Sequence, residues 1–239
     1  SGQFILGMYK GAVAVAVYAV AIQLQGIYMS FSTAISGVFL PKVTAMVAKE
    51  NNEKAISDLF IRMGRIQYAI MAFILTGFIL FGKVFIYFWA GSDYDEAYYI
   101  ALLFFIPLTI PLIQNLGIII LQARNQMRFR CVLYVVIAFV SLGISIPLAR
   151  LYGGIGCALG TVFALVVGQI IAMNIYYHRR IHIDIVRFWK EIFRMSLVPI
   201  LLGGVGYCFL NMITLTNAWE LGLAILLFSL IYVPLFWYM

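Results

Sequence analysis

Apolar runs about as long as a bilayer is thick recur along the whole chain, and they constrain its fold more than any other feature. A helix needs about 20 mostly apolar residues to cross roughly 30 Å of hydrocarbon. Seven stretches meet this requirement: Ala12–Leu40, Ile66–Phe88, Ala97–Leu121, Cys131–Leu148, Gly154–Tyr177, Met195–Met212 and Leu221–Trp237. The sequence therefore predicts an all-α, polytopic membrane helix bundle of about seven transmembrane helices, which form a single transmembrane region over residues 1–239.

The composition of the chain agrees with a lipid environment. Hydrophobic residues make up 64% of the chain and charged residues 10%, whereas soluble domains are about 45–50% apolar and about 25% charged. A soluble fold of 239 residues could not bury this much apolar surface. Lipid is therefore expected to be the solvent for most of it, and the lipid bilayer is the first partner that the sequence predicts.

Lysine and arginine are concentrated in three of the loops between the apolar runs. The loops Pro41–Arg65, Gln122–Arg130 and His178–Arg194 hold five, three and five of them, which is 13 of the 16 in the chain. Seven spans place all three loops on one side, and the positive-inside rule makes that side cytoplasmic, with the N-terminus outside and the C-terminus inside. The net charge of +7 is thus interpreted as an orientation signal. No nucleic-acid partner is expected, because the basic residues do not form one patch.

One half of the first predicted span is rich in small and polar side chains. An unpaired polar group in hydrocarbon costs several kcal/mol, so these side chains need partners or water. The face either packs tightly against another helix through its small residues or forms the wall of a hydrated cavity. Gln23 and Gln25 are long for a close-packed seam and favour the cavity. The face consists of Tyr18, Gln23, Gln25, Gly26, Ser30, Ser32, Thr33, Ser36 and Gly37.

The third predicted span repeats this pattern with two prolines. Pro107 and Pro111 each remove a backbone donor and favour a kink, and Gln114, Asn115 and Gln122 lie on the same side of the span. A kinked helix that carries amides suits a carrier that bends between two states. A static kink, satisfied by neighbouring helices, is the alternative.

The two polar faces together predict a substrate cavity lined by Tyr18, Gln25, Ser32, Ser36, Gln114, Asn115 and Gln122. Three basic residues, Lys42, Arg124 and Arg128, follow these spans on the basic side. They could attract a phosphate-bearing substrate to the cytoplasmic mouth, or they could serve orientation alone. No Asp, Glu, Arg, Lys or His lies in the middle of any predicted span, so a group that couples transport to an ion is expected elsewhere.

The sequence contains no motif that indicates catalysis or a cofactor. It has no GxGxxG before a helix, no P-loop, no HExxH and no Ser/His/Asp constellation. The three cysteines lie in separate apolar runs and the two histidines share one basic loop, so no metal site is expected. We therefore predict a protein that is not an enzyme and that uses no cofactor.

The last basic loop contains an amphipathic helix. Ile185, Phe188, Trp189, Ile192 and Phe193 fall on one face at helical spacing, and charged residues occupy the other face. The sequence predicts that this helix lies in the headgroup plane, with anchoring favoured over partner binding.

Three stretches, taken in order, resemble one family of transporters. They are GAVAVAVYAVAIQLQGIYMSFSTAISGVFLPKVT, the loop LQARNQMRFR, and the helix LYGGIGCALGTVFALVVGQIIAMNIYYHRR. Their order and spacing resemble those of the polysaccharide (O-antigen, Wzx-type) flippases, over roughly Gly11–Arg194. The family belongs to the multidrug/oligosaccharidyl-lipid/polysaccharide exporter superfamily.

The resemblance implies a fold of twelve or fourteen helices in two lobes, of which this chain is the second, flippase-like lobe. The missing N-terminal half of the transporter is then a partner. Family members move undecaprenyl-diphosphate-linked oligosaccharides from the inner to the outer leaflet of the bacterial plasma membrane, by alternating access, for the biosynthesis of O-antigen, lipopolysaccharide and other surface polysaccharides. Other polysaccharide assembly proteins are further partners that the resemblance implies.

Three other functions are weighed against a flippase. A multidrug or cation antiporter shares the fold, and ion-dependent efflux would favour it. A membrane-embedded glycosyltransferase or polysaccharide polymerase needs a sizeable outer loop with acidic, Arg or His residues, and the outward loops of this chain are short. A non-transporting scaffold of the polysaccharide assembly machinery has no use for amides at membrane depth.

Overall fold

The computed structural model describes residues 2–49, 53–210 and 217–237, and the regular structure in these ranges is helical. Six helical segments are long and apolar enough to cross a membrane: Ala12–Met46, Glu53–Trp89, Ser92–Ile113, Arg128–Arg180, Ile185–Leu210 and Ala218–Phe236. The predicted all-α, polytopic membrane bundle is therefore confirmed. In chain order the helices are α1 (Gly2–Tyr9), α2 (Ala12–Lys49), α3 (Glu53–Trp89), the 3₁₀ turn η1 (Ser92–Tyr94), α4 (Asp95–Ile113), α5 (Asn115–Ala123), α6 (Arg128–Leu165), the π-helix η2 (Val166–Ala172), α7 (Met173–Arg180), α8 (Ile185–Met195), α9 (Leu197–Leu210) and α10 (Ala218–Trp237).

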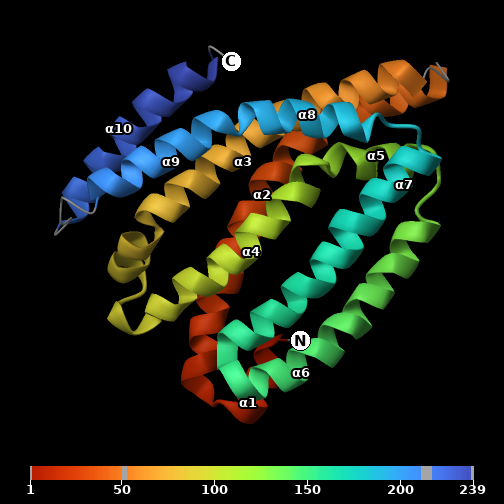
Figure 1. Ribbon diagram of the computed structural model, residues 1–239. Helices are drawn as coiled ribbons and strands as arrows, with labels where there is room; N and C mark the ends of the chain where they lie inside the picture. Colours follow the sequence, from red (N-terminus) through yellow and green to blue (C-terminus); the bar gives the residue numbers. More distant parts are fainter. Residues whose placement is uncertain (1, 50–52, 211–216, 238–239) are drawn as a thin grey trace.

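The segment from α6 to α7 is a hairpin of two antiparallel arms (Figure 1). Gly153 has φ 61° and ψ −133° and reverses the chain there. On either side of it, Ser145 Oγ donates to the carbonyl of Cys157 at 3.1 Å, and further out the rings of Phe129 and Tyr176 stack at 4.2 Å. The fourth and fifth predicted spans are therefore the two separate arms of this hairpin, which together form the single long helical segment Arg128–Arg180.

The three basic connections lie toward one end of the bundle (Figure 1). At this end Arg187 on α8 forms an ion pair with Asp58 on α3 at 2.6 Å, and the rings of Phe60 and Tyr177 lie 5.9 Å apart. The α3–α4 connection and the Gly153 turn lie toward the opposite end. We call the first of these the basic end of the bundle.

Two helices extend well beyond the spans that hydropathy predicts. α2 continues through Pro41 to Lys49, although the sequence predicted its span to end at Leu40. A proline removes only its own backbone donor, and Thr44 Oγ1 donates to the carbonyl of Leu40 at 2.8 Å in the turn that follows. α3 begins at Glu53, before the predicted start at Ile66. Its first three turns lie at the basic end, outside the predicted span.

The amphipathic helix α8 packs against protein with most of its apolar face. Ile185, Phe188 and Ile192 are buried, while Phe193 remains 77% exposed. Phe188 fits over Gly64 of α3, where a side chain would collide with its ring. The headgroup-plane anchor stays a prediction, and protein covers most of the face on which it rests, since hydropathy shows that a face is apolar but not whether protein or lipid covers it.

The last two predicted spans correspond to α9 and α10. The part of Met195–Met212 beyond Leu210 lies outside the described residues. Both helices lie at one edge of the bundle, beside α3 (Figure 1). The core that positions the candidate site lies elsewhere, between α2, α4–α5 and the α6–α7 hairpin.

Candidate functional site

A cavity of about 340 Å³ lies between α2, the α4–α5 junction and the two arms of the α6–α7 hairpin. Its wall mixes apolar side chains with amides from three different helices. Its lining residues are Gln25, Met29 and Thr33 from α2, Leu108, Pro111, Leu112, Gln114, Asn115 and Ile118 from α4–α5, and Arg130, Tyr134, Leu165, Gln169, Met173 and Tyr177 from the hairpin.

The third predicted span is broken where it meets this cavity. α4 ends at Ile113 and α5 begins at Asn115, and Gln114 between them has φ −99° and ψ 13°. Pro107 and Pro111 lie in the two turns before the break, where each removes one intrahelical hydrogen bond. The predicted kink is thus a break in the helix, and it places two successive amide side chains on the cavity wall.

The side chain of Gln114 is 2% exposed and forms direct hydrogen bonds with Asn174 of α7. Gln114 Nε2 donates to Asn174 Oδ1 at 2.9 Å, and Asn174 Nδ2 donates back to Gln114 Oε1 at 3.4 Å. Trp189 Nε1 of α8 also donates to Asn174 Oδ1, at 3.1 Å. The amide pair therefore connects the broken helix to the hairpin and to the helix that covers the basic end.

Behind the cavity wall, Ser32 of α2 satisfies a backbone carbonyl next to the break, and Ser36 and Gln67 pack behind it. Ser32 Oγ donates to the carbonyl of Leu112 at 2.8 Å, and Asn115 Nδ2 reaches Ser32 Oγ at 3.5 Å. Ser36 Oγ donates to the carbonyl of Ser32 at 2.9 Å and accepts from Gln67 Nε2 at 2.5 Å. Both serines are buried and do not line the cavity, so they support the break and do not form a surface for a ligand.

Two amides in the cavity wall have polar atoms without a protein partner. Gln25 Oε1 and Gln169 Nε2 are buried and have no hydrogen-bond partner among the described residues. Gln25 Nε2 has only the thioether of Met29, at 3.9 Å. Leaving a buried polar atom unpaired costs about 1–3 kcal/mol. The cavity wall therefore includes two amide side chains that the protein does not fully satisfy.

The cavity also contains a cation, which sequence reasoning assigned to a loop. Arg130 lies two residues inside α6 and lines the cavity at the basic end of the bundle. Its Nη2 donates to the hydroxyl of Tyr134 at 2.7 Å, and its guanidinium carbon lies 5.0 Å from the centre of that ring. No acidic side chain is among the described lining residues, so the cavity favours a ligand with negative charge.

The predicted cavity residues thus divide into three groups. Gln25, Gln114 and Asn115 line one common cavity, and Ser32 and Ser36 lie behind its wall.

The other two predicted residues lie elsewhere. Tyr18 is two turns before Gln25 on the same face of α2, where it is 3% exposed and its ring meets Phe104 at 6.1 Å. Gln122 is exposed near the end of α5, beyond the cavity. A polar face predicted from periodicity runs along the whole helix, whereas the cavity touches only part of it. At Tyr18 the face of α2 is covered by protein.

The predicted cytoplasmic mouth is also not part of the cavity lining. Lys42 and Arg128 are exposed, and Arg124 is half-buried at the end of α5. These residues share the basic end with the cavity, but Arg130 is the basic residue that enters it. The sequence could not separate Arg128 from Arg130, because the helix they share was predicted to start only at Cys131.

Four further functional side chains were missed by the sequence reasoning: Arg130, Tyr134, Gln169 and Asn174. Amides within an apolar run are a usable signal, because a polar group at membrane depth needs a partner, and Gln169 and Asn174 both lie in the fifth predicted span. Residues 130 and 134, and 169, 173 and 177, also share a helix face at i, i+4 spacing.

The fold and the site together define a multi-pass membrane protein, a mainly apolar helix bundle with a partly open cavity whose wall includes amides and an arginine. Comparisons with models of protein families, with curated proteins and with solved structures give no match to this chain.

Proposed function

We propose that the chain forms one lobe of a carrier that flips lipid-linked oligosaccharides, as undecaprenyl-diphosphate-sugars, across the bacterial plasma membrane by alternating access. One observation carries this proposal: Gln25, Gln114 and Asn115 share a single cavity with Arg130 inside an otherwise apolar bundle. Amides suit sugar hydroxyls as donors and acceptors, and an arginine suits a phosphate. The product would serve surface polysaccharide biosynthesis.

The charge of the cavity favours an anionic substrate over the cationic drugs of an antiporter. Arg130 is the charged side chain among the described lining residues, and its guanidinium would repel a cationic drug. Hydrogen bonds to a charged group contribute about 1.5–3 kcal/mol. An anionic diphosphate therefore fits the cavity better than an organic cation, and we place the cation antiporter second.

Irregular backbone on two sides of the cavity supports a bending mechanism. The α4–α5 break and the π-helix η2 both face it, through Gln114 and Gln169. Broken helices at membrane depth are tolerated where they line a cavity, and π-helices occur often at functional sites. We propose that these two irregular segments change shape between the inward and outward states.

The proposal includes an orientation and a set of partners. The basic end faces the cytoplasm, with the N-terminus outside and the C-terminus inside. An N-terminal half of the transporter completes the cavity from the other side. The substrate and other polysaccharide assembly proteins are the remaining partners, and the chain itself carries out no chemical reaction.

A flipping assay tests the proposal. The protein, together with its N-terminal half, is reconstituted in liposomes with a fluorescent polyprenyl-diphosphate oligosaccharide, and a membrane-impermeant quencher reports how much has changed leaflet. We expect Arg130→Gln to lower the flipping rate roughly 10- to 100-fold. This is the fold-change that corresponds to the free energy of one hydrogen bond to a charged group.

The matched control is Gln23→Leu, which removes an exposed amide two residues from Gln25 and outside the cavity lining. It should flip at the rate of the unmodified protein. Wild-type flipping in Arg130→Gln, or export of organic cations driven by a proton or sodium gradient, would reject the flippase in favour of the antiporter.

A further inference from the structure

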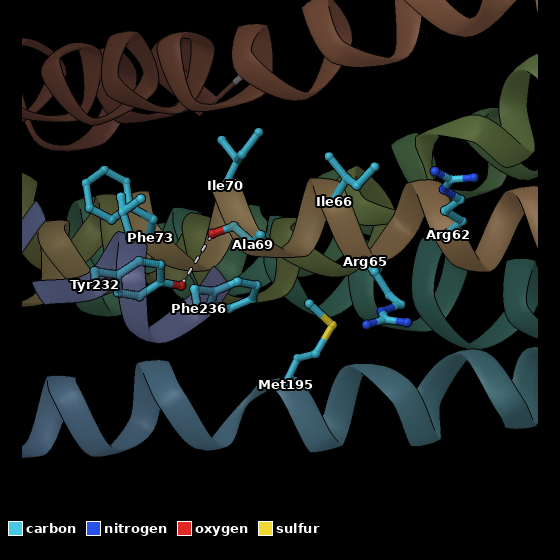
Figure 2. A pocket seen from close by; sticks show the side chains of 10 residues that line it. Arg62, Arg65, Ile66, Ala69, Ile70, Phe73, Met195, Tyr232 and Phe236 are labelled. Atoms are coloured by element: carbon cyan, nitrogen blue, oxygen red, sulfur yellow. Dashed lines mark hydrogen bonds between the residues drawn. The ribbon is translucent and has the colours of Figure 1, made fainter. Parts of the chain in front are cut away.

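A second hollow, on the outside of the bundle, lies between α3, the end of α8 and α10 (Figure 2). It has a volume of about 630 Å³ and is separate from the polar cavity. On α3 it is formed by residues spaced i, i+3, i+4, i+7, i+8 and i+11, which is one continuous helix face. We call it the α3–α10 crevice, and it is lined by Arg62, Arg65, Ile66, Ala69, Ile70, Phe73, Met195, Tyr232, Val233 and Phe236.

The α3–α10 crevice is apolar along its length and basic at one end. Figure 2 shows Arg62 and Arg65 at one end of the α3 face and Phe73 at the other. Arg65 Nη1 has an anionic partner in Glu191 of α8, at 3.5 Å, and both side chains are partly exposed. Arg62 is exposed and has no ion pair among the described residues. This end can therefore accept a further negative charge.

Only the far half of the apolar face is covered by α10. Phe73 stacks on Phe228 at 5.5 Å, and the hydroxyl of Tyr232 donates to the carbonyl of Ala69 at 3.3 Å. Ile66 and Ile70, closer to the arginines, are 43% and 36% exposed. The arginines lie just before the predicted span that begins at Ile66, so they are at headgroup depth and the open apolar face is at acyl-chain depth.

We propose that the α3–α10 crevice binds an anionic glycerophospholipid of the surrounding bilayer, with its phosphate at Arg62 and Arg65 and an acyl chain along the apolar face. The arrangement requires a ligand with negative charge at headgroup depth and a flexible chain attached below it. Basic sites between transmembrane helices are suited to anionic headgroups. A free phosphate would leave the apolar face uncovered, and an apolar peptide would leave Arg62 without a counter-charge.

The site is independent of the proposed flippase, because none of its residues lines the polar cavity. A bound phospholipid would join α10 to α3 beyond Tyr232. We infer that it completes the packing of the loosely held edge of the bundle.

Lipid binding is measured by native mass spectrometry of the protein in a neutral detergent. Phosphatidylglycerol is compared with phosphatidylcholine of the same acyl chains and with glycerol 3-phosphate, which has the charge but no chain. We expect phosphatidylglycerol to bind best and glycerol 3-phosphate not to bind. The double variant Arg62→Gln/Arg65→Gln should weaken phosphatidylglycerol binding ~30-fold, at about fivefold per basic residue.

The charge control is Arg179→Gln/Arg180→Gln, which removes two exposed charges from the basic end outside the crevice and should leave binding unchanged. A second variant, Ile70→Trp, fills the crevice without a change of charge and should also abolish binding, whereas Val132→Trp on exposed α6 should not.

Equal binding of both phospholipids, equal loss in the charge control, or unchanged binding in Ile70→Trp would overturn the proposal. Displacement of phosphatidylglycerol by a much lower concentration of polyprenyl phosphate would also overturn it, because the crevice would then be a site for a polyprenyl chain. None of these readouts depends on transport, so a failed flipping assay leaves the crevice proposal standing.

Discussion

Gln114 and Asn174, 60 residues apart in the chain, exchange two side-chain hydrogen bonds at 2.9 and 3.4 Å. The first residue lies at the break of a span and the second on the far arm of the hairpin. This pair is therefore the polar contact through which a change of angle at the break would reach α7. Asn174 has two other partners, the carbonyl of Ile170 and the indole of Trp189, and so keeps its position when Gln114 is changed.

Gln114→Leu is expected to lower the free energy of unfolding by about 1–2 kcal/mol. Single interhelical hydrogen bonds in membranes contribute about 0.6 kcal/mol on average and up to about 1.7, and this substitution removes two. The measurement is a double-mutant cycle with Asn174→Leu, by denaturation in mixed detergent. The double variant should be less destabilised than the sum of the two single variants. Strict additivity would mean that the two amides do not interact.

The close approach of α8 to α3 at Gly64 leads to a second prediction. A Cβ at this position would collide with the ring of Phe188 and lie 3.2 Å from the carbonyl oxygen of Ile113. Phe188 is fully buried and its ring meets Phe60 at 5.1 Å, so it cannot move aside freely. Gly64→Ala should therefore destabilise the protein by about 1–3 kcal/mol.

Gly26→Ala is the matched control for Gly64→Ala, because a Cβ at Gly26 meets nothing within 4 Å. Alanine is favoured over glycine inside a helix by about 0.5–1 kcal/mol, so this variant should be neutral or slightly more stable. Thermal unfolding in detergent should thus show shifts of opposite sign for the two substitutions. A gain in stability for Gly64→Ala would show that α8 does not pack on α3 as described.

The helical type and the membrane-spanning stretches follow from hydropathy, and the element ends and the breaks within spans do not. Seven apolar runs predict seven crossings because a bilayer fixes the length of a span. The same rule says nothing about helix outside the hydrocarbon, so it missed the continuation of α2 past Pro41 and the early start of α3 at Glu53. Hydrogen bonding, which does not stop at the edge of the hydrocarbon, decides those ends.

Part of the candidate site was predictable, because an amide in hydrocarbon signals a partner or water. That argument places Gln25, Gln114 and Asn115 on one cavity. It cannot say how far along a helix the cavity extends, so Tyr18 was included wrongly. Arg130 was missed for another reason: an arginine at a helix end looks like an orientation signal, and only packing shows that it turns inward.

The hairpin turn predicts a strong preference for glycine at position 153. Its φ of 61° and ψ of −133° lie in a region that side chains with a Cβ avoid, at a cost of about 1–3 kcal/mol. Gly153→Ala should therefore lower the unfolding midpoint measured by circular dichroism. Gly143→Ala, within α6 and with open space around its Cβ, should keep or raise it. Equal midpoints for the two variants would argue against a turn at Gly153.

The hydration of the polar cavity can be tested by cysteine labelling. The native Cys131, Cys157 and Cys208 are free, and replacing them with alanine gives a background in which single cysteines can be read. Gln25→Cys and Asn115→Cys line the cavity, so each should react with a small, charged, membrane-impermeant thiol reagent when the cavity is open to water.

Ser36→Cys is the control on the same helix as Gln25. Ser36 is 4% exposed and lies behind the cavity wall, so its cysteine should stay protected until the protein is unfolded. A phosphate-bearing sugar lipid should slow the labelling of Gln25→Cys, because Gln25 and Arg130 line the same cavity. If all three positions stayed equally protected in every condition, the cavity would be dry, and its amides would serve only to hold the helices together.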